Sequence, residues 1–113
     1  MARSIVKVVG VSEIDVINAI ESKSFQDMLG ESVVVAGAAL TEDSHDGNTE
    51  TRAYIFAADG EVYGGISDTM CGSISMMIDY MSIKPGVVFA ANVREKVSRN
   101  GRNFLTVTFN EVH

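Results

Sequence analysis

The sequence predicts a mainly β protein, a small five-stranded antiparallel barrel with short helices and an N-terminal helical segment. Two apolar stretches are each interrupted by a glycine turn, at 59–60 and at 99–101, which is typical of β-hairpins. A run rich in β-branched residues, 31–40, precedes the first hairpin. The clearest helical periodicity, at 68–81, separates the two hairpins. These features give the order strand, strand, strand, helix, strand, strand.

The 113 residues are expected to form one domain, with 1–30 as an N-terminal arm and helical segment and 31–113 as the barrel. A content of 46% hydrophobic and 21% charged residues is that of a globular protein. No apolar run reaches the roughly 20 residues of a membrane helix, and the N-terminal run is too short for a secretory signal. A lone cysteine, Cys71, excludes an internal disulfide and fits a reducing compartment. We therefore expect a cytoplasmic protein without a membrane partner.

The N-terminal segment is expected to hold a short strand or extended arm at 4–11, followed by two helical pieces. Ser12 is a side-chain cap and predicts a helix that runs to residue 20 or 21. The segment 22–30 predicts a further turn of helix, which Gly30 ends. The buried side of that turn is expected to consist of Phe25, Met28 and Leu29.

The apolar run 31–40 is expected to be the first barrel strand, and Gly37 within it indicates a bulge or a sharp bend. The next ten residues, 41–50, are polar throughout and are expected to form a mobile loop. Their carboxylates lack the spacing and the terminal glutamate of the calcium loop. No metal or other cofactor is expected.

The hairpin at 51–67 carries the first candidate binding surface. A two-residue loop at 59–60 would place Phe56 opposite Tyr63. Because side chains alternate along a strand, one face would then carry an arginine and three aromatic residues, namely Arg52, Tyr54, Phe56 and Tyr63. Such a face could stack nucleobases, or it could pack beneath the N-terminal helix or against a second subunit. The residues themselves leave these alternatives open.

The stretch 68–81 predicts a helix, with 67–68 as its capping side chains and 85–86 (Pro-Gly) as its stop. Its apolar stripe is expected to be core and consists of Met70, Ile74, Met77, Ile78 and Met81. Cys71 on this helix is expected to be an inert thiol because its surroundings are apolar. Since His45 lies in the polar loop and His113 at the terminus, no general base is evident, and we do not expect an enzyme.

The last hairpin, 87–112, has two possible registers. A two-residue loop at 100–101 would mix apolar and charged residues on both faces, whereas a three-residue loop at 99–101 separates them. With the three-residue loop, the side chains that point inward are Val93, Val97, Leu105, Val107 and Phe109. Those that point outward are Arg94, Lys96, Arg102, Phe104, Thr106 and Thr108. Glu95 is the one misfit on the inner side.

The charge is distributed unevenly along the chain. The net charge is −6, yet residues 1–83 hold 4 Lys/Arg against 13 Asp/Glu, and residues 84–113 hold 5 against 2. Four cations fall within nine residues: Arg94, Lys96, Arg99 and Arg102. This cluster could be a solvated hairpin tip, or it could contact phosphate groups.

A helix between the third and fourth of five antiparallel strands is the layout of the OB-fold, which binds oligonucleotides on its second and third strands. The stretch from Phe25 to Phe109 resembles the small OB-fold single-stranded DNA-binding proteins of bacteriophages, especially those of Gram-positive hosts. The similar features are SFQDMLGE entering the first strand, DGEVYGGIS leading into a helix rich in methionine and isoleucine, and SRNGRNFLTVTF at the end.

The resemblance implies a non-enzymatic, sequence-tolerant binder of single-stranded DNA that acts in phage replication or recombination in the bacterial cytoplasm. It also implies a homo-oligomer, with phage or host replication proteins as further partners. Bacterial single-stranded DNA-binding proteins usually end in a flexible tail of acidic and aromatic residues that recruits partners, whereas this chain ends FNEVH after its last predicted strand. Recruitment through such a tail is therefore not expected.

Binding of single strands requires flat aromatic surfaces for bases and cations for phosphates. The residues expected to supply them are Arg52, Tyr54, Phe56, Tyr63, Arg94, Lys96, Arg99, Arg102 and Phe104. The alternative is a structural or adaptor protein that self-associates through its aromatic sheet face. RNA in place of DNA is a third possibility, because stacking surfaces do not distinguish the two.

Overall fold

The computed structural model of the chain describes residues 2–113. Its strands are β1 (Ala2–Val9), β2 (Lys23–Ser24), β3 (Ser32–His45), β4 (Asn48–Ala57), β5 (Val62–Gly65), β6 (Val88–Val97) and β7 (Asn103–Val112). Its helices are α1 (Glu13–Ile17), the short 3-10 helix η1 (Phe25–Met28) and α2 (Asp68–Ser82). The predicted mainly β class with few helices is confirmed.

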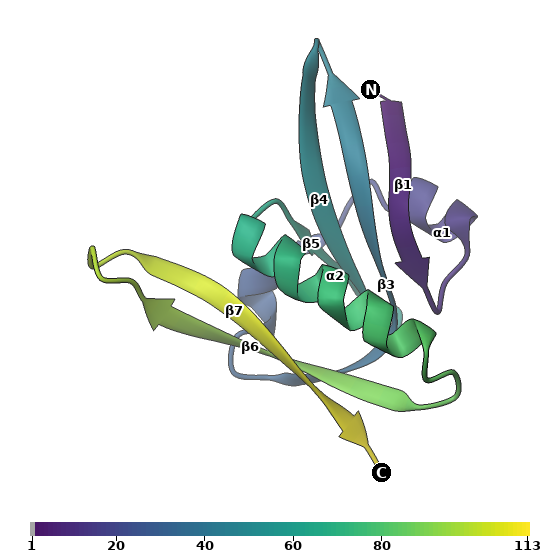
Figure 1. Cartoon of the computed structure of the whole chain (residues 1–113), viewed down its shortest axis with the longest axis vertical. Helices are drawn as coiled ribbons and strands as arrows, with labels where there is room; N and C mark the ends of the chain where they lie inside the picture. The colour runs from purple at the N-terminus through teal and green to yellow at the C-terminus, as the bar shows by residue number, and fades with distance from the viewer. Residues whose placement is uncertain (1) are drawn as a thin grey trace.

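All strands belong to one curled sheet, in which α2 lies between the two halves (Figure 1). The order of neighbouring strands is β2-β5-β4-β3-β6-β7, and β1 pairs with β3. Pairing is antiparallel except between β2 and β5. The sheet has seven strands, two more than predicted, because the N-terminal segment contributes both β1 and β2.

The bend predicted at Gly37 is present and divides β3 into two parts. The pairing of β3 with β4 shifts between Val35 and Gly37. Before the shift β3 also pairs with β6, and after it β3 pairs with β1. A Cβ atom on Gly37 would lie 2.5 Å from the carbonyl oxygen of Val9, so only glycine allows β1 to approach this closely.

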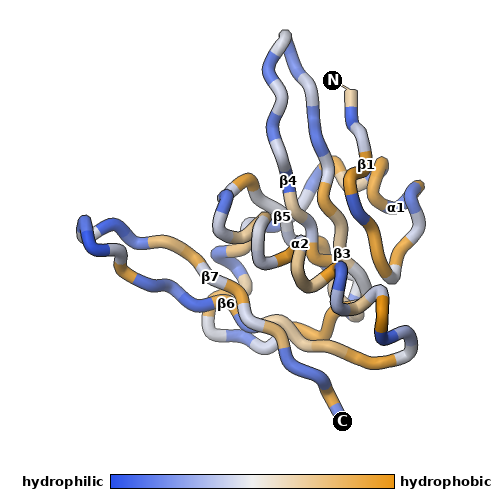
Figure 2. The backbone as a smooth tube through the Cα atoms, viewed as in Figure 1, coloured by the Kyte–Doolittle hydropathy of each residue, from blue (hydrophilic) through white to orange (hydrophobic). Residues whose placement is uncertain are grey.

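The predicted mobile loop at 41–50 is wrong. Strands β3 and β4 continue through it as a hairpin that pairs His45 with Asn48, and the turn consists of Asp46 and Gly47, both with positive φ. Backbone pairing does not require apolar side chains, and β1 supports the hairpin by pairing as far as Ser44. The polar sequence therefore marks a ribbon that projects into solvent, as its hydrophilic tip in Figure 2 shows.

The predicted helix is confirmed as α2, with the side chain of Ser67 accepting a hydrogen bond from the Met70 amide. All five residues of the predicted stripe are buried in the main core, together with Phe25, Met28, Ile55, Phe89 and Val93. Burial of this stripe against the concave side of the sheet is the main source of apolar stabilisation. No helix within residues 2–113 is long and apolar enough to span a bilayer.

The predicted register of the last hairpin is confirmed. Val97 pairs with Asn103, the Ser98 amide donates to the Arg102 carbonyl, and Gly101 has φ +75°. Val93 and Val107 are buried as expected. Val97, although on the inward face, is 68% exposed because the hairpin extends beyond the body of the protein (Figure 1).

The N-terminal predictions are confirmed in part. Ser12 and Asp15 form a capping box at the start of α1, but the helix ends at Ile17. In the turn at 25–28, Phe25 and Met28 are buried as predicted. Leu29 is 38% exposed, so its predicted burial is wrong, because the 3-10 turn ends before it and directs its side chain outward.

We predict opposite effects for two glycine-to-alanine changes. Gly37→Ala lowers the free energy of unfolding by about 1–3 kcal/mol, because the new methyl group meets backbone atoms. Gly72→Ala, at a helical position with open space around it, raises it by about 0.5–1 kcal/mol. Urea denaturation monitored by circular dichroism measures both. Equal effects of the two changes would contradict the close approach of β1.

Candidate nucleic-acid interface

The register of the β4–β5 hairpin differs from the prediction by one residue. Ile55, not Phe56, lies opposite Tyr63. The Ala57 amide donates to the Glu61 carbonyl, so the loop holds three residues, 58–60. The Ala58 amide donates instead to the Val34 carbonyl of β3. This shift moves Tyr63 to the opposite face of the sheet from Tyr54.

The predicted exposed aromatic face is therefore wrong. Tyr54 and Phe56 share a face with Arg52 as expected, but their exposed fractions are 1% and 8%. They pack with Val16, Ala19 and other residues beneath the N-terminal segment. Tyr63, 6% exposed, belongs to the main core. The sequence left open whether these rings stack nucleobases or pack within the protein. Tyr54 and Phe56 pack beneath the N-terminal helical segment.

The guanidinium group of Arg3 holds this N-terminal cover in place. It donates to the carboxylate of Asp43 at 2.8 Å through two nitrogen atoms and to the hydroxyl of Tyr54 at 2.6 Å. It also donates to the carbonyls of Val16 and Ala19 at the end of the α1 segment. The hydrogen bonds from Arg3 lower the pKa of Asp43, so the carboxylate is ionised at neutral pH. One cation thus joins β1, α1, β3 and β4.

The other predicted residues gather on the outward face of the last hairpin. Lys96 on β6 lies opposite Phe104 on β7, and Arg94 lies opposite Thr106. Arg102 immediately precedes β7 and has the same facing by alternation. We call Arg94, Lys96, Arg102 and Phe104 the cationic face. Its three cations are exposed and Phe104 is half-buried, while Arg99 lies in the turn beyond them.

The cations of this face form no ion pair with any residue of the described chain, 2–113. Of the nine lysine and arginine side chains in the sequence, four contact carboxylates, namely Arg3, Lys7, Lys23 and Lys84. Within residues 2–113, the remaining five have no carboxylate within 4.0 Å, and they are the five cations predicted to bind phosphate: Arg52, Arg94, Lys96, Arg99 and Arg102. An unpaired cation can bind a phosphate without first giving up a partner. Figure 2 shows the hydrophilic character of this hairpin tip.

Arg52 is not part of the cationic face. It lies on β4, which β3 separates from the β6–β7 pair, and it is paired with Thr41. Arg52 also lies on the hairpin whose tip is acidic. The structure thus brings four of the nine predicted residues into one surface, adds Arg99 at its end, and places the other four elsewhere.

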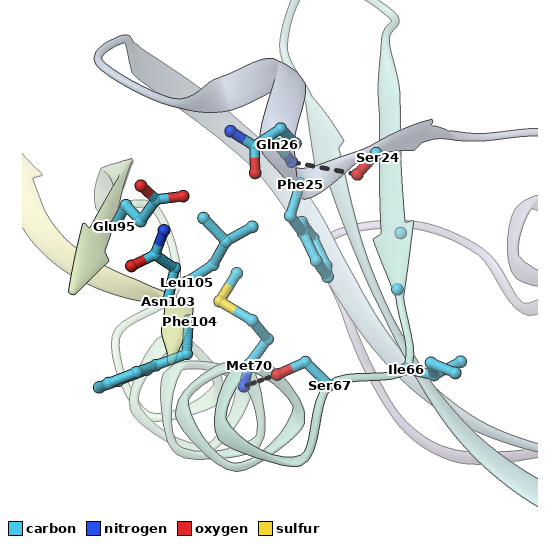
Figure 3. Close-up of a pocket in the computed structure, with 12 residues that line it drawn as sticks. Ser24, Phe25, Gln26, Ile66, Ser67, Met70, Glu95, Asn103, Phe104 and Leu105 are labelled. Atoms are coloured by element: carbon cyan, nitrogen blue, oxygen red, sulfur yellow. Dashed lines mark hydrogen bonds between the residues drawn. The ribbon is translucent and has the colours of Figure 1, made fainter. Parts of the chain in front are cut away.

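A pocket that the sequence did not predict lies between β5 and β7. Among the described residues, β5 pairs with β2 and β4, and β7 pairs only with β6, so these two strands leave a gap in the sheet. The gap holds a pocket of about 370 Å³, lined in part by Phe25, Met70, Glu95, Asn103 and Leu105 (Figure 3). The misfit of Glu95 on the inward face was the one sequence signal that pointed to it.

Two observations concern chemistry other than binding. Cys71 is buried, and desolvation raises the pKa of its thiol, which keeps it protonated and weakly reactive. Among residues 2–113, no three His, Cys, Asp or Glu side chains gather in a way that could hold a metal ion.

Comparison with known families decides the class of the protein. Residues 5–110 match the family described as phage single-stranded DNA-binding protein. The chain belongs to this family. The family resemblance stated from the sequence is thus confirmed, and membership makes the protein a non-enzymatic binder of single-stranded DNA that acts in phage DNA replication. No curated protein and no solved structure matches the chain.

For this phage single-stranded DNA-binding protein, we predict that Tyr54 supports the fold. Tyr54→Ala lowers the free energy of unfolding by about 3–5 kcal/mol, as expected for a large buried ring. Tyr54→Phe removes only the hydroxyl that Arg3 contacts and costs about 1 kcal/mol. Urea denaturation measures both. If Tyr54→Ala weakened DNA binding at an unchanged unfolding midpoint, Tyr54 would be a stacking surface after all.

Proposed function

We propose that the protein binds the DNA strand along the cationic face of the β6–β7 hairpin. The observation that carries this proposal is the separation of the cations into two groups. The cations of the body other than Arg52 are held by carboxylates, whereas the four of the hairpin are exposed and unpaired within residues 2–113. Release of counterions from the strand then favours binding at this hairpin.

The cationic face offers both kinds of contact that a single strand needs. Arg94, Lys96 and Arg102 supply charges for successive phosphates. Phe104, opposite Lys96, supplies a ring on which a base stacks. Because every base has a flat π surface, such contacts tolerate any sequence. This favours a coating function over recognition of one site.

The fold supports this location if the body is an OB-fold. The chain order β3, β4, β5, α2, β6, β7 has the layout of that fold, with β1, β2 and α1 as additions. In OB-folds the second and third strands and the loops after the first and fourth strands bind oligonucleotides. Here β4 corresponds to the second strand of the OB-fold, and the N-terminal segment covers its outer face. The loop after the fourth strand, β6, carries Arg99 and Arg102, and Arg94 and Lys96 lie at the end of β6 next to it.

Further parts of the proposal concern the setting of this activity. The protein would act in the cytoplasm of the infected cell, in recombination as well as replication, and would cover long single strands as several copies. The alternative of an adaptor that self-associates through its aromatic sheet face is not favoured, because that face is buried within the chain.

A titration of fluorescent oligo-dT across salt concentrations tests the proposed site. We expect the affinity for oligo-dT to fall steeply as the salt concentration rises. In a plot of log affinity against log salt concentration, the slope should become shallower by about 0.7 for each phosphate contact that a variant loses. Arg94→Gln should reduce the slope by about this amount. Lys84→Gln is the matched control, since it removes one charge from a lysine that Glu111 already holds at 3.0 Å. Its slope should equal that of the wild type.

Absence of binding to oligo-dT at low salt would contradict the proposed function. Binding with equal slopes for the wild type, Arg94→Gln and Lys84→Gln would retain DNA binding but move it away from the cationic face.

We also predict that Phe104 stacks on a base. Phe104→Ala should weaken oligo-dT binding roughly fivefold, the lower end of the range for removal of one stacking ring, because the ring is half-buried. Phe104→Tyr keeps the ring and should bind like the wild type. Tyrosine fluorescence quenching by DNA at the new side chain would give a second readout. Equal affinities of the alanine and tyrosine variants would contradict stacking at this position.

A further inference from the structure

The pocket between β5 and β7 combines apolar side chains with exposed polar side chains at its rim. Figure 3 shows Met70 and Leu105 reaching toward Phe25, with the polar ends of Glu95, Asn103 and Gln26 beside them. Within residues 2–113, the side chains of Glu95, Asn103 and Gln26 form no hydrogen bond. A pocket of about 370 Å³ with a few polar groups is of the size that small organic ligands occupy.

Glu95 is the unusual member of this pocket. It is the only acid among the cations of the hairpin, at 94–102, and it forms no ion pair with them. The reason is strand alternation, which directs Arg94 and Lys96 to the cationic face and Glu95 to the other side, opposite Leu105. Its carboxylate is therefore a free hydrogen-bond acceptor at the mouth of the pocket.

The free edge of β7 connects the pocket with the cationic face. β7 pairs only with β6, so its other edge has no neighbouring strand within residues 2–113. Arg102 and Phe104 lie on one side of this edge and Asn103 and Leu105 on the other, and residues 103–105 all line the pocket. A DNA strand bound along the cationic face can therefore turn one base over the edge of β7 into the pocket.

We infer that the pocket takes one guanine base of the bound strand, and this inference rests on the proposed function. Guanine carries two adjacent donors on its pairing edge, the N1–H and the N2 amino group. A carboxylate can accept both in parallel, in the bidentate geometry that it adopts with arginine. Thymine has a single N–H between two carbonyl oxygens, and these oxygens would face the carboxylate of Glu95, acceptor against acceptor. Adenine and cytosine place a ring acceptor beside their amino group.

The apolar lining suits the face of a purine ring. Leu105 on β7 is half-buried and offers apolar surface at the side of the pocket, while Phe25 on η1 and Met70 on α2 form a floor that is almost fully covered. Gly65 on β5 leaves room for Phe25, because a Cβ atom there would lie 2.9 Å from the phenyl ring. The pocket thus adds one base-selective position to a surface that otherwise tolerates any sequence.

Three fluorescent oligonucleotides of equal length test the inference: all-dT, dT with one central deoxyguanosine, and dT with one central deoxyinosine. Deoxyinosine has the N1–H but lacks the N2 amino group. We expect the wild-type protein to bind the guanosine oligonucleotide about fivefold more tightly than the other two, the low end for a bidentate base contact. Glu95→Gln should bring the guanosine-to-inosine affinity ratio close to one.

The guanosine-to-inosine affinity ratio separates recognition of the base from the effect of charge on overall affinity. Glu95→Gln removes a negative charge from a cationic hairpin and should raise the affinity for all three oligonucleotides. Glu50→Gln is the matched control, since it removes an exposed carboxylate on β4 that lies outside the pocket, and it should keep the wild-type ratio. Circular dichroism verifies that both variants are folded.

A wild-type ratio of one overturns the inference, as does a preference for guanosine that survives in Glu95→Gln. In either case binding of all-dT would leave the proposed function standing. If all-dT does not bind at low salt, the proposed function fails, and the guanine site fails with it.

Discussion

The bend of β3 at Gly37 is the constraint on which the rest of the structure depends. Because the strand changes direction there, its first part pairs with β6 and its second part with β1. The same strand therefore supports two hairpins that leave the body in different directions, and α2 fills the concave space between them (Figure 1). A straight strand would stack the two hairpins side by side in a flat sheet, with no concave side in which to bury α2.

The Arg3 network closes the face of the sheet on which the sequence predicted DNA to bind. By joining Asp43, Tyr54 and the end of the α1 segment, Arg3 closes the outer face of β4 against solvent. A buried ion pair of this kind gains little net stability, but removal of one partner leaves an uncompensated charge. The network therefore fixes the position of the N-terminal segment more than it adds stability. The closure of this face is one reason for the proposal that DNA binds at the exposed cations of the last hairpin.

The sequence predicted those features that depend on local chemistry or on burial of one face. The register of β6 and β7 followed from apolar alternation, the bend from Gly37, and the end of α2 from Pro85. The features that it missed depend on distant partners. A loop of two or three residues fits Asp59-Gly60 equally well, and the bond from the Ala58 amide to Val34 selects the longer one. Burial of Tyr54 depends on Arg3, which is 51 positions away. The strands within 41–50 depend on backbone pairing, which a polar composition conceals.

The two projecting hairpins also give the molecule an electric dipole. The β3–β4 hairpin is rich in acids and the β6–β7 hairpin in bases, and the two tips lie far apart (Figures 1 and 2). Opposite charges held at a distance form a dipole, and the field of a polyanion exerts a torque on it. If the cationic face binds DNA as proposed, this dipole is expected to turn the basic end toward the strand before contact, within a range of about 10 Å at 0.1 M salt. Dilution of the salt lengthens this range, so the fraction of encounters that begin in the productive orientation depends on ionic strength.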